Sequence, residues 1–171
     1  MTRISRKVCI IGDFAVGKTS TVTRFVNNVF SEKYLTTVGV KIDTKDLELV
    51  DGRSLRMVIW DIAGSDRFSS AEFAYMRGAQ GYLLVVDGTR KETLASALAL
   101  RAAVEERYGA LPFVLLLNKY DLVDEWSVSD AEIEALNKQG VLVLCTSAMT
   151  GKCVEKAFRD LAKSLTGVSA A

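Results

Sequence analysis

The sequence lacks any apolar run long enough to cross a bilayer, and residues 1–7 lack the apolar core of a secretory signal. Lysine and arginine (22) nearly balance aspartate and glutamate (21), so no basic surface for nucleic acid or acidic membranes is indicated. Only three cysteines are present, an odd number that is typical of reduced thiols rather than of a disulfide framework. These absences favour a cytoplasmic protein that binds no nucleic acid.

The chain also lacks internal repeats, low-complexity segments and proline-rich linkers. At 171 residues, 49% of them hydrophobic, it can bury a core without disulfides or metal ions. We therefore expect one domain over residues 5–166, with short polar or flexible tails at 1–4 and 167–171. The last residues contain no cysteine for prenylation, so peripheral membrane association would need a partner or a tail that this chain does not carry.

Uniformly apolar runs alternate with segments of helical periodicity, which predicts an α/β fold with a mostly parallel sheet and helices on both faces. Asp51-Gly52 is typical of a hairpin that adds one antiparallel strand, and a change of phase between Thr44 and Leu47 suggests a bulge there. Six strands are expected in all. The apolar runs are residues 7–11, 55–62, 82–87, 113–117 and 141–145, and the helical segments are residues 19–28, 92–106, 129–136 and 154–165.

The segment from Gly12 to Thr19 fits the phosphate-loop pattern, with two glycines followed by lysine and a hydroxyl residue. It lies between an expected strand and an expected helix, so its backbone N–H groups and the helix N-terminus would converge on an anion. Gly12 and Gly17 permit close approach, Lys18 supplies charge for the β- and γ-phosphates, and the Thr19 hydroxyl can bind Mg²⁺. We therefore expect a P-loop NTPase fold.

Further polar residues follow other strands, where ligands of such sheets bind. Asp61 can hold Mg²⁺, and the Gly64 N–H can meet a γ-phosphate. Asp121, in Asn118-Lys119-x-Asp121, can accept two hydrogen bonds from guanine, whereas adenine has neither donor. The backbone of Ser147-Ala148 can donate to the guanine O6.

With these motifs the sequence resembles the Ras superfamily of small GTPases, and within it the Rab-like branch. The resemblance runs from Arg6 to Leu165 and includes Thr37-Val38-Gly39, Trp60-Asp61-x-Ala63-Gly64 and Thr146-Ser147-Ala148. It implies a small G-protein domain that binds GTP and GDP with Mg²⁺. It also implies protein effectors and regulators that contact the segments around Thr37 and Gly64, which order and release with the γ-phosphate.

The resemblance implies roles for further residues. Phe30 would pack edgewise on the guanine, Tyr34 would close over the phosphates, and Thr37 would bind Mg²⁺ when a γ-phosphate is present. The expected metal ligands are Thr19, Thr37 and Asp61, and the expected catalytic residues are Lys18, Thr37, Gly64 and Ser65. The expected nucleotide-binding residues are Asp13, Phe14, Ala15, Val16, Gly17, Lys18, Thr19, Ser20, Phe30, Tyr34, Thr37, Gly64, Asn118, Lys119, Asp121, Ser147, Ala148 and Met149.

Three residues depart from the family pattern. Ser65 stands where glutamine usually orients the attacking water, Phe14 where glycine or serine is usual, and Met149 where lysine follows Ser147-Ala148. Thr37, Asp61 and Gly64 are intact and favour a working molecular switch. Ser65 and Phe14 predict that it hydrolyses GTP slowly, and they also favour an alternative. The alternative is a hydrolysis-deficient pseudo-GTPase that holds GTP constitutively and acts as a scaffold. A P-loop kinase would need a lid or a second substrate site, and no insertion is long enough for either.

Overall fold

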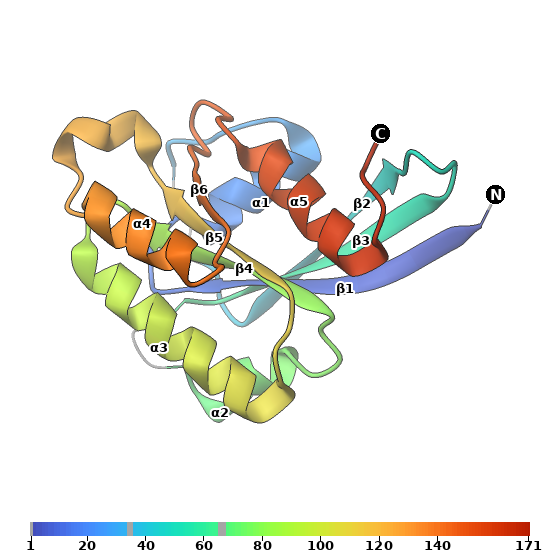
Figure 1. The fold of residues 1–171 in the computed structure, drawn as a ribbon, viewed down its shortest axis with the longest axis horizontal. Coiled ribbons are helices and arrows are strands. Elements are labelled where there is room, and N and C mark those ends of the chain that lie inside the picture. Colours follow the sequence, from blue (N-terminus) through green and yellow to red (C-terminus); the bar gives the residue numbers. More distant parts are fainter. Residues whose placement is uncertain (1, 34–35, 65–67) are drawn as a thin grey trace.

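The computed structural model describes residues 2–33, 36–64 and 68–171. Within that part of the chain, six strands form one sheet in the order β2-β3-β1-β4-β5-β6 (Figure 1). β2 is antiparallel to β3, and every other neighbouring pair is parallel. The predicted α/β fold with a six-stranded, mostly parallel sheet is thus confirmed. In chain order the elements are β1 (Arg3–Gly12), α1 (Lys18–Asn27), β2 (Val40–Glu48), β3 (Ser54–Ile62), α2 (Ser70–Tyr75), β4 (Gly81–Asp87), α3 (Lys91–Tyr108), β5 (Phe113–Asn118), the 3₁₀ helix η1 (Tyr120–Glu125), α4 (Asp130–Lys138), β6 (Val143–Cys145) and α5 (Val154–Thr166).

Helices cover both faces of the sheet, with α1 and α5 on one face and α2, α3 and α4 on the other (Figure 1). On the first face Phe25 of α1 stacks on Phe158 of α5, with ring centroids 3.8 Å apart. On the second face Met76, Leu84 and Leu100 belong to a separate buried cluster. Every residue of β4 is buried because both of its faces are covered, which explains its uninterrupted apolar sequence.

The bulge expected in β2 is absent. Its register with β3 is continuous from the pair Val40 and Ile62 to the pair Glu48 and Ser54. Ile42 lies on the outer face and is 49% exposed, whereas Leu47 is buried on the inner face. The apolar side chains therefore change from one face of a regular strand to the other, and this exchange produces the shift of phase in the sequence.

Both ends of the chain run along the β2–β3 side of the molecule. β1 begins at Arg3, inside the segment 1–4 that was expected to be a tail. At the other end, Ala170 forms an antiparallel bridge with Leu49, and the Ala171 N–H donates to the Glu48 carbonyl at 2.7 Å. These contacts add short pairings beyond the regular strands. No helix among the described residues is long and apolar enough to span a membrane.

The topology brings five loops to one edge of the sheet. Since β1, β3, β4 and β5 are parallel, the segments after their last residues meet at their carboxyl ends. β6 runs parallel to β5 and adds the loop that begins at Thr146. Sequence motifs as far apart as Gly12 and Thr146 can therefore contribute to one site.

Candidate functional site

The loop between β1 and α1 is folded tightly, and two of its glycines are required by space. Gly17 has a φ of 102°, and a Cβ there would lie 2.3 Å from the Asn118 Nδ2. At Gly12 a Cβ would lie 2.4 Å from the Val85 carbonyl oxygen of β4. Ala15 also has a left-handed backbone, with a φ of 57°. The loop thus turns its backbone sharply, as an anion-binding loop does.

Lys18 begins α1 and is buried under this loop. Its Nζ donates to the Gly12 carbonyl at 3.2 Å and to the Asp13 carbonyl at 2.7 Å. Burial lowers the pKa of Lys18 to about 8, although the neighbouring Asp61 and Asp13 carboxylates raise it. An anionic ligand would stabilise the charged form of this lysine.

Gly64, just beyond β3, lies against the same loop. A Cβ at this position would be 2.3 Å from the Lys18 Nζ and 2.6 Å from the Asp13 carbonyl oxygen. Only glycine fits at this distance, so the backbone of the β3–α2 segment touches the phosphate loop directly.

Three side-chain oxygens converge beside Lys18. The Thr19 Oγ1 lies 2.5 Å from the Thr37 Oγ1 and donates to the Asp61 Oδ2 at 2.6 Å. The Asp61 Oδ1 is buried and has no hydrogen-bond partner among the described residues. Burial raises the pKa of Asp61, against the opposing effects of the Thr19 hydrogen bond and the Lys18 charge. A buried carboxylate oxygen without a donor, next to two hydroxyls, fits the hard oxygen ligands that Mg²⁺ requires.

Asn118, the last residue of β5, joins the phosphate loop to the loop after β6. Its Nδ2 donates to the Val16 carbonyl at 3.0 Å. Its Oδ1 accepts from the Thr146 hydroxyl at 3.2 Å and from the Ala148 N–H at 3.3 Å. The buried amide therefore fixes the relative position of two sequence motifs.

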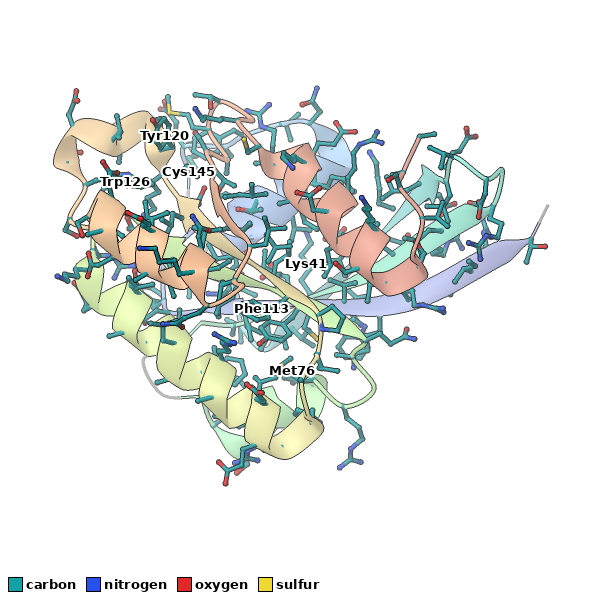
Figure 2. The ribbon with its side chains drawn as sticks, in the orientation of Figure 1. Lys41, Met76, Phe113, Tyr120, Trp126 and Cys145 are labelled. Carbon is teal, nitrogen blue, oxygen red and sulfur yellow. The ribbon has the colours of Figure 1, made fainter. Side chains whose placement is uncertain are left out.

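Lys119 has a left-handed backbone with a φ of 68°. Its carbonyl accepts from the Leu122 N–H at 2.8 Å and from the Trp126 indole at 3.2 Å. The Trp126 ring stands perpendicular to Tyr120 at 5.3 Å, and both come from the segment after β5 (Figure 2). The Lys119 ammonium in turn donates to the Ala15 carbonyl at 3.0 Å. These contacts tie the motif Asn118-Lys119-x-Asp121 to the phosphate loop.

A cavity of about 370 Å³ lies beside Lys119. Asp121 also lines it, and the Asp121 carboxylate accepts from the Ser147 hydroxyl at 2.7 Å. The lining includes nine residues expected to bind nucleotide, namely Ala15, Gly17, Ser20, Phe30, Asn118, Lys119, Asp121, Ala148 and Met149. The expected contacts of Tyr34 and Ser65 lie outside the described residues. The Phe14 ring is 47% exposed, while its N–H donates to the Asp13 carboxylate at 2.6 Å.

Sequence reasoning missed several residues that shape this site. Arg24 of α1 donates to the Ala148 carbonyl at 2.8 Å and to the Met149 carbonyl at 2.5 Å, and so fixes the loop after β6. No sequence pattern relates a half-buried helix residue to a loop 124 positions later. Asp87 could have been found, because it is a carboxylate that directly follows an apolar strand at the ligand-binding edge.

This arrangement defines a P-loop nucleotide-binding protein. The model of the Ras family matches residues 7–167. The chain is 36% identical to the Ras-related protein RGP2 of Oryza sativa subsp. japonica over 164 residues, which are 95% of this chain and 75% of that protein. It is 36% identical to the Ras-related protein RABA2b of Arabidopsis thaliana over 157 residues, 91% of this chain and 73% of that protein. It is 35% identical to the GTP-binding protein ypt2 of Schizosaccharomyces pombe over 161 residues, 93% of this chain and 80% of that protein.

The chain therefore belongs to the Ras family, and among the families of P-loop proteins it is a small, Rab-like GTPase. The family resemblance expected from the sequence motifs is confirmed.

Proposed function

We propose that residues 5–166 form a G domain that binds GTP and GDP with Mg²⁺ and acts as a molecular switch with slow GTP hydrolysis. One observation carries this proposal. One cavity is lined both by Asp121 and by the phosphate-loop residues Ala15 and Gly17. It thus joins a site that can read a base to a site that can hold phosphates.

At the phosphate end, Lys18 would neutralise charge on the β- and γ-phosphates, and the Gly64 N–H would bind the γ-phosphate. Thr19, Thr37 and Asp61 would hold Mg²⁺, which supplies further charge neutralisation at the phosphate oxygens when bound. The convergence of these three oxygens beside the Lys18 ammonium supports this assignment.

The switch itself would depend on Thr37, whose hydroxyl lies 2.5 Å from that of Thr19, and on Gly64, whose backbone lies against the phosphate loop. Next to Thr37, Val38 is 89% exposed. Ile42 of β2 is a second exposed apolar side chain near Thr37 in the sequence. We expect protein effectors and regulators to contact these side chains, since the order of the Thr37 segment would change with the γ-phosphate.

Slow hydrolysis follows from Ser65 and Phe14. A serine is too short to orient water as glutamine does, and poor positioning forfeits much of the rate gained from an ordered nucleophile. Single-turnover hydrolysis of bound GTP tests this. A measurable rate below that of a Ras-family protein with glutamine at the same position is expected. Retention of GTP without hydrolysis would favour the pseudo-GTPase scaffold instead.

Base selectivity tests the nucleotide assignment. Asp121→Asn replaces a carboxylate acceptor by an amide that also donates, so preference should shift from GDP to xanthosine diphosphate. Asp124→Asn, an exposed carboxylate on the same helix η1, is the matched control and should keep the preference for GDP. The dissociation constants of both variants are measured by calorimetry. If wild type bound ADP with a dissociation constant within about tenfold of that for GDP, the assignment would be contradicted. A tenfold difference is only about 1.4 kcal/mol of binding free energy, too little for two hydrogen bonds that adenine cannot make.

A further inference from the structure

Asp87, the last residue of β4, holds two cations with one carboxylate. Its Oδ2 accepts from the Lys119 Nζ at 2.8 Å and from the Arg90 Nε at 3.1 Å. Its Oδ1 accepts from the Thr89 N–H at 2.9 Å and from the Thr89 hydroxyl at 2.7 Å. Burial raises the pKa of Asp87, but the hydrogen bonds from Lys119 and Thr89 outweigh burial and lower it. The group is therefore a fully bonded carboxylate.

Each of the two cations also binds a carbonyl of the phosphate loop. The Arg90 Nη2 donates to the Phe14 carbonyl at 2.6 Å, and the Lys119 Nζ donates to the Ala15 carbonyl at 3.0 Å. Two consecutive carbonyls are thus fixed from outside the loop by side chains that share one buried anchor.

The direction of these carbonyls determines the direction of the loop's N–H groups. In a trans peptide the C=O of one residue and the N–H of the next point in opposite directions, and the described chain has no cis peptide bond. When the Phe14 carbonyl is held toward Arg90, the Ala15 N–H must point to the other side. Ala15 has the left-handed backbone that a non-glycine residue adopts at some cost, so an external contact helps to keep it there.

We propose that Arg90 is a positioning residue of the phosphate loop, which uses its anchor on Asp87 to fix the Phe14 carbonyl and thereby aims the Ala15 N–H at the β-phosphate of the bound nucleotide. This role rests on the proposed nucleotide function. Unlike Lys119, Arg90 does not line the base cavity. Arginine suits the role because its planar fork reaches two acceptors at once, which a lysine ammonium at this position does not do with the same geometry.

The test compares GDP with GMP, because only GDP has a β-phosphate. Dissociation constants are measured by calorimetry, or by competition with a fluorescent GDP, for wild type, Arg90→Ala and Arg90→Lys. Arg53→Ala is the matched control, since the Arg53 side chain is 36% exposed like that of Arg90 and also pairs with an aspartate, at 2.7 Å.

Arg90→Ala should weaken GDP binding by about tenfold to 100-fold, the range for losing a hydrogen bond from a charged group, while GMP binding stays the same. Arg90→Lys keeps a cation beside buried Asp87, so it serves if Arg90→Ala does not fold, and it should show a smaller loss that is again specific to GDP. The control, Arg53→Ala, should leave the dissociation constants for GDP and GMP unchanged.

Three results would overturn the role of Arg90. The first is that Arg90→Ala weakens GDP and GMP binding equally, and the second is that Arg90→Ala leaves the GDP dissociation constant unchanged. The third is that Arg90→Lys binds GDP as tightly as wild type does, which would mean that only the positive charge matters. Failure of wild type to bind any guanine nucleotide would instead refute the proposed function, so the two failures are distinguishable.

Discussion

Gly17→Ala tests whether the close contact between the phosphate loop and Asn118 holds the site together. A Cβ at Gly17 would lie 2.3 Å from the Asn118 Nδ2, which donates to the Val16 carbonyl. Gly52 is the matched control, because its φ of 82° is also left-handed but a Cβ there would meet nothing within 4 Å. The two variants therefore share the backbone strain and differ in the steric contact.

The magnitudes follow from these contacts. Gly52→Ala should cost roughly 1 kcal/mol of unfolding free energy, because strain of about 1–2 kcal/mol is partly offset by the reduced entropy of the unfolded chain. Gly17→Ala should cost about 2–4 kcal/mol, since displacing Asn118 also leaves buried polar groups unsatisfied at about 1–3 kcal/mol.

Urea denaturation of each variant, without nucleotide and with excess GDP, measures both effects. Bound GDP raises the free energy of unfolding. In Gly17→Ala this increase should be smaller than in wild type, by about 2.7 kcal/mol for each 100-fold loss of GDP affinity. Gly52→Ala should gain as much from GDP as wild type does. Equal destabilisation in the two variants would refute the reasoning, because the contact with Asn118 would then have no energetic weight.

Three further predictions concern the switch, the chemistry and the core. Thr37→Ala should leave GDP affinity nearly unchanged but remove the protease protection that a non-hydrolysable GTP analogue gives residues 31–40; equal protection of wild type by GDP and the analogue would argue against a switch. Phe14→Gly combined with Ser65→Gln should accelerate single-turnover hydrolysis beyond the product of the single effects, since both groups act at one site; a wild-type rate equal to that of the double variant would mean that another residue orients the water. Burial raises the pKa of Cys9 to about 12, so a thiol reagent at pH 8 should leave Cys9 unmodified until denaturant is added, and native modification of Cys9→Ser should equal that of wild type.

Much of the fold was predictable because strong periodicity and local chemistry agree with it. The run 82–87 is apolar at nearly every position, as a strand covered on both faces must be, and it forms β4. The helical segment expected from residue 129 forms α4, and a capping box of Ser129 and Glu132 begins it. The structure of β2 was harder to predict. An alternating pattern shows which residues share a face of a strand, but it does not show which face is covered. The expected strand 141–145 is shorter in the structure, where β6 spans Val143–Cys145.

The candidate site was predictable where its function requires a residue type at a fixed spacing. The two loop glycines and Lys18 are examples, because a Cβ or a missing ammonium would be incompatible with the loop's geometry. The side chains that support the loop from outside were not predictable. Arg24 and Arg90 bind backbone carbonyls far away in sequence, and a carbonyl is present at every residue, so it leaves no sequence signal.

The indole of Trp126 gives the protein an intrinsic fluorescent probe near Lys119. Trp126 donates to the carbonyl of Lys119, a residue that lines the cavity, and its ring lies where a Cβ on Gly88 would come within 2.3 Å. The chain has two tryptophans, and the other, Trp60, lies on β3 with the Lys7 ammonium 3.7 Å from its ring centroid. Trp60→Phe would therefore leave Trp126 as the single tryptophan, so a change of tryptophan emission on adding nucleotide would report on the segment that carries Lys119 without an attached dye.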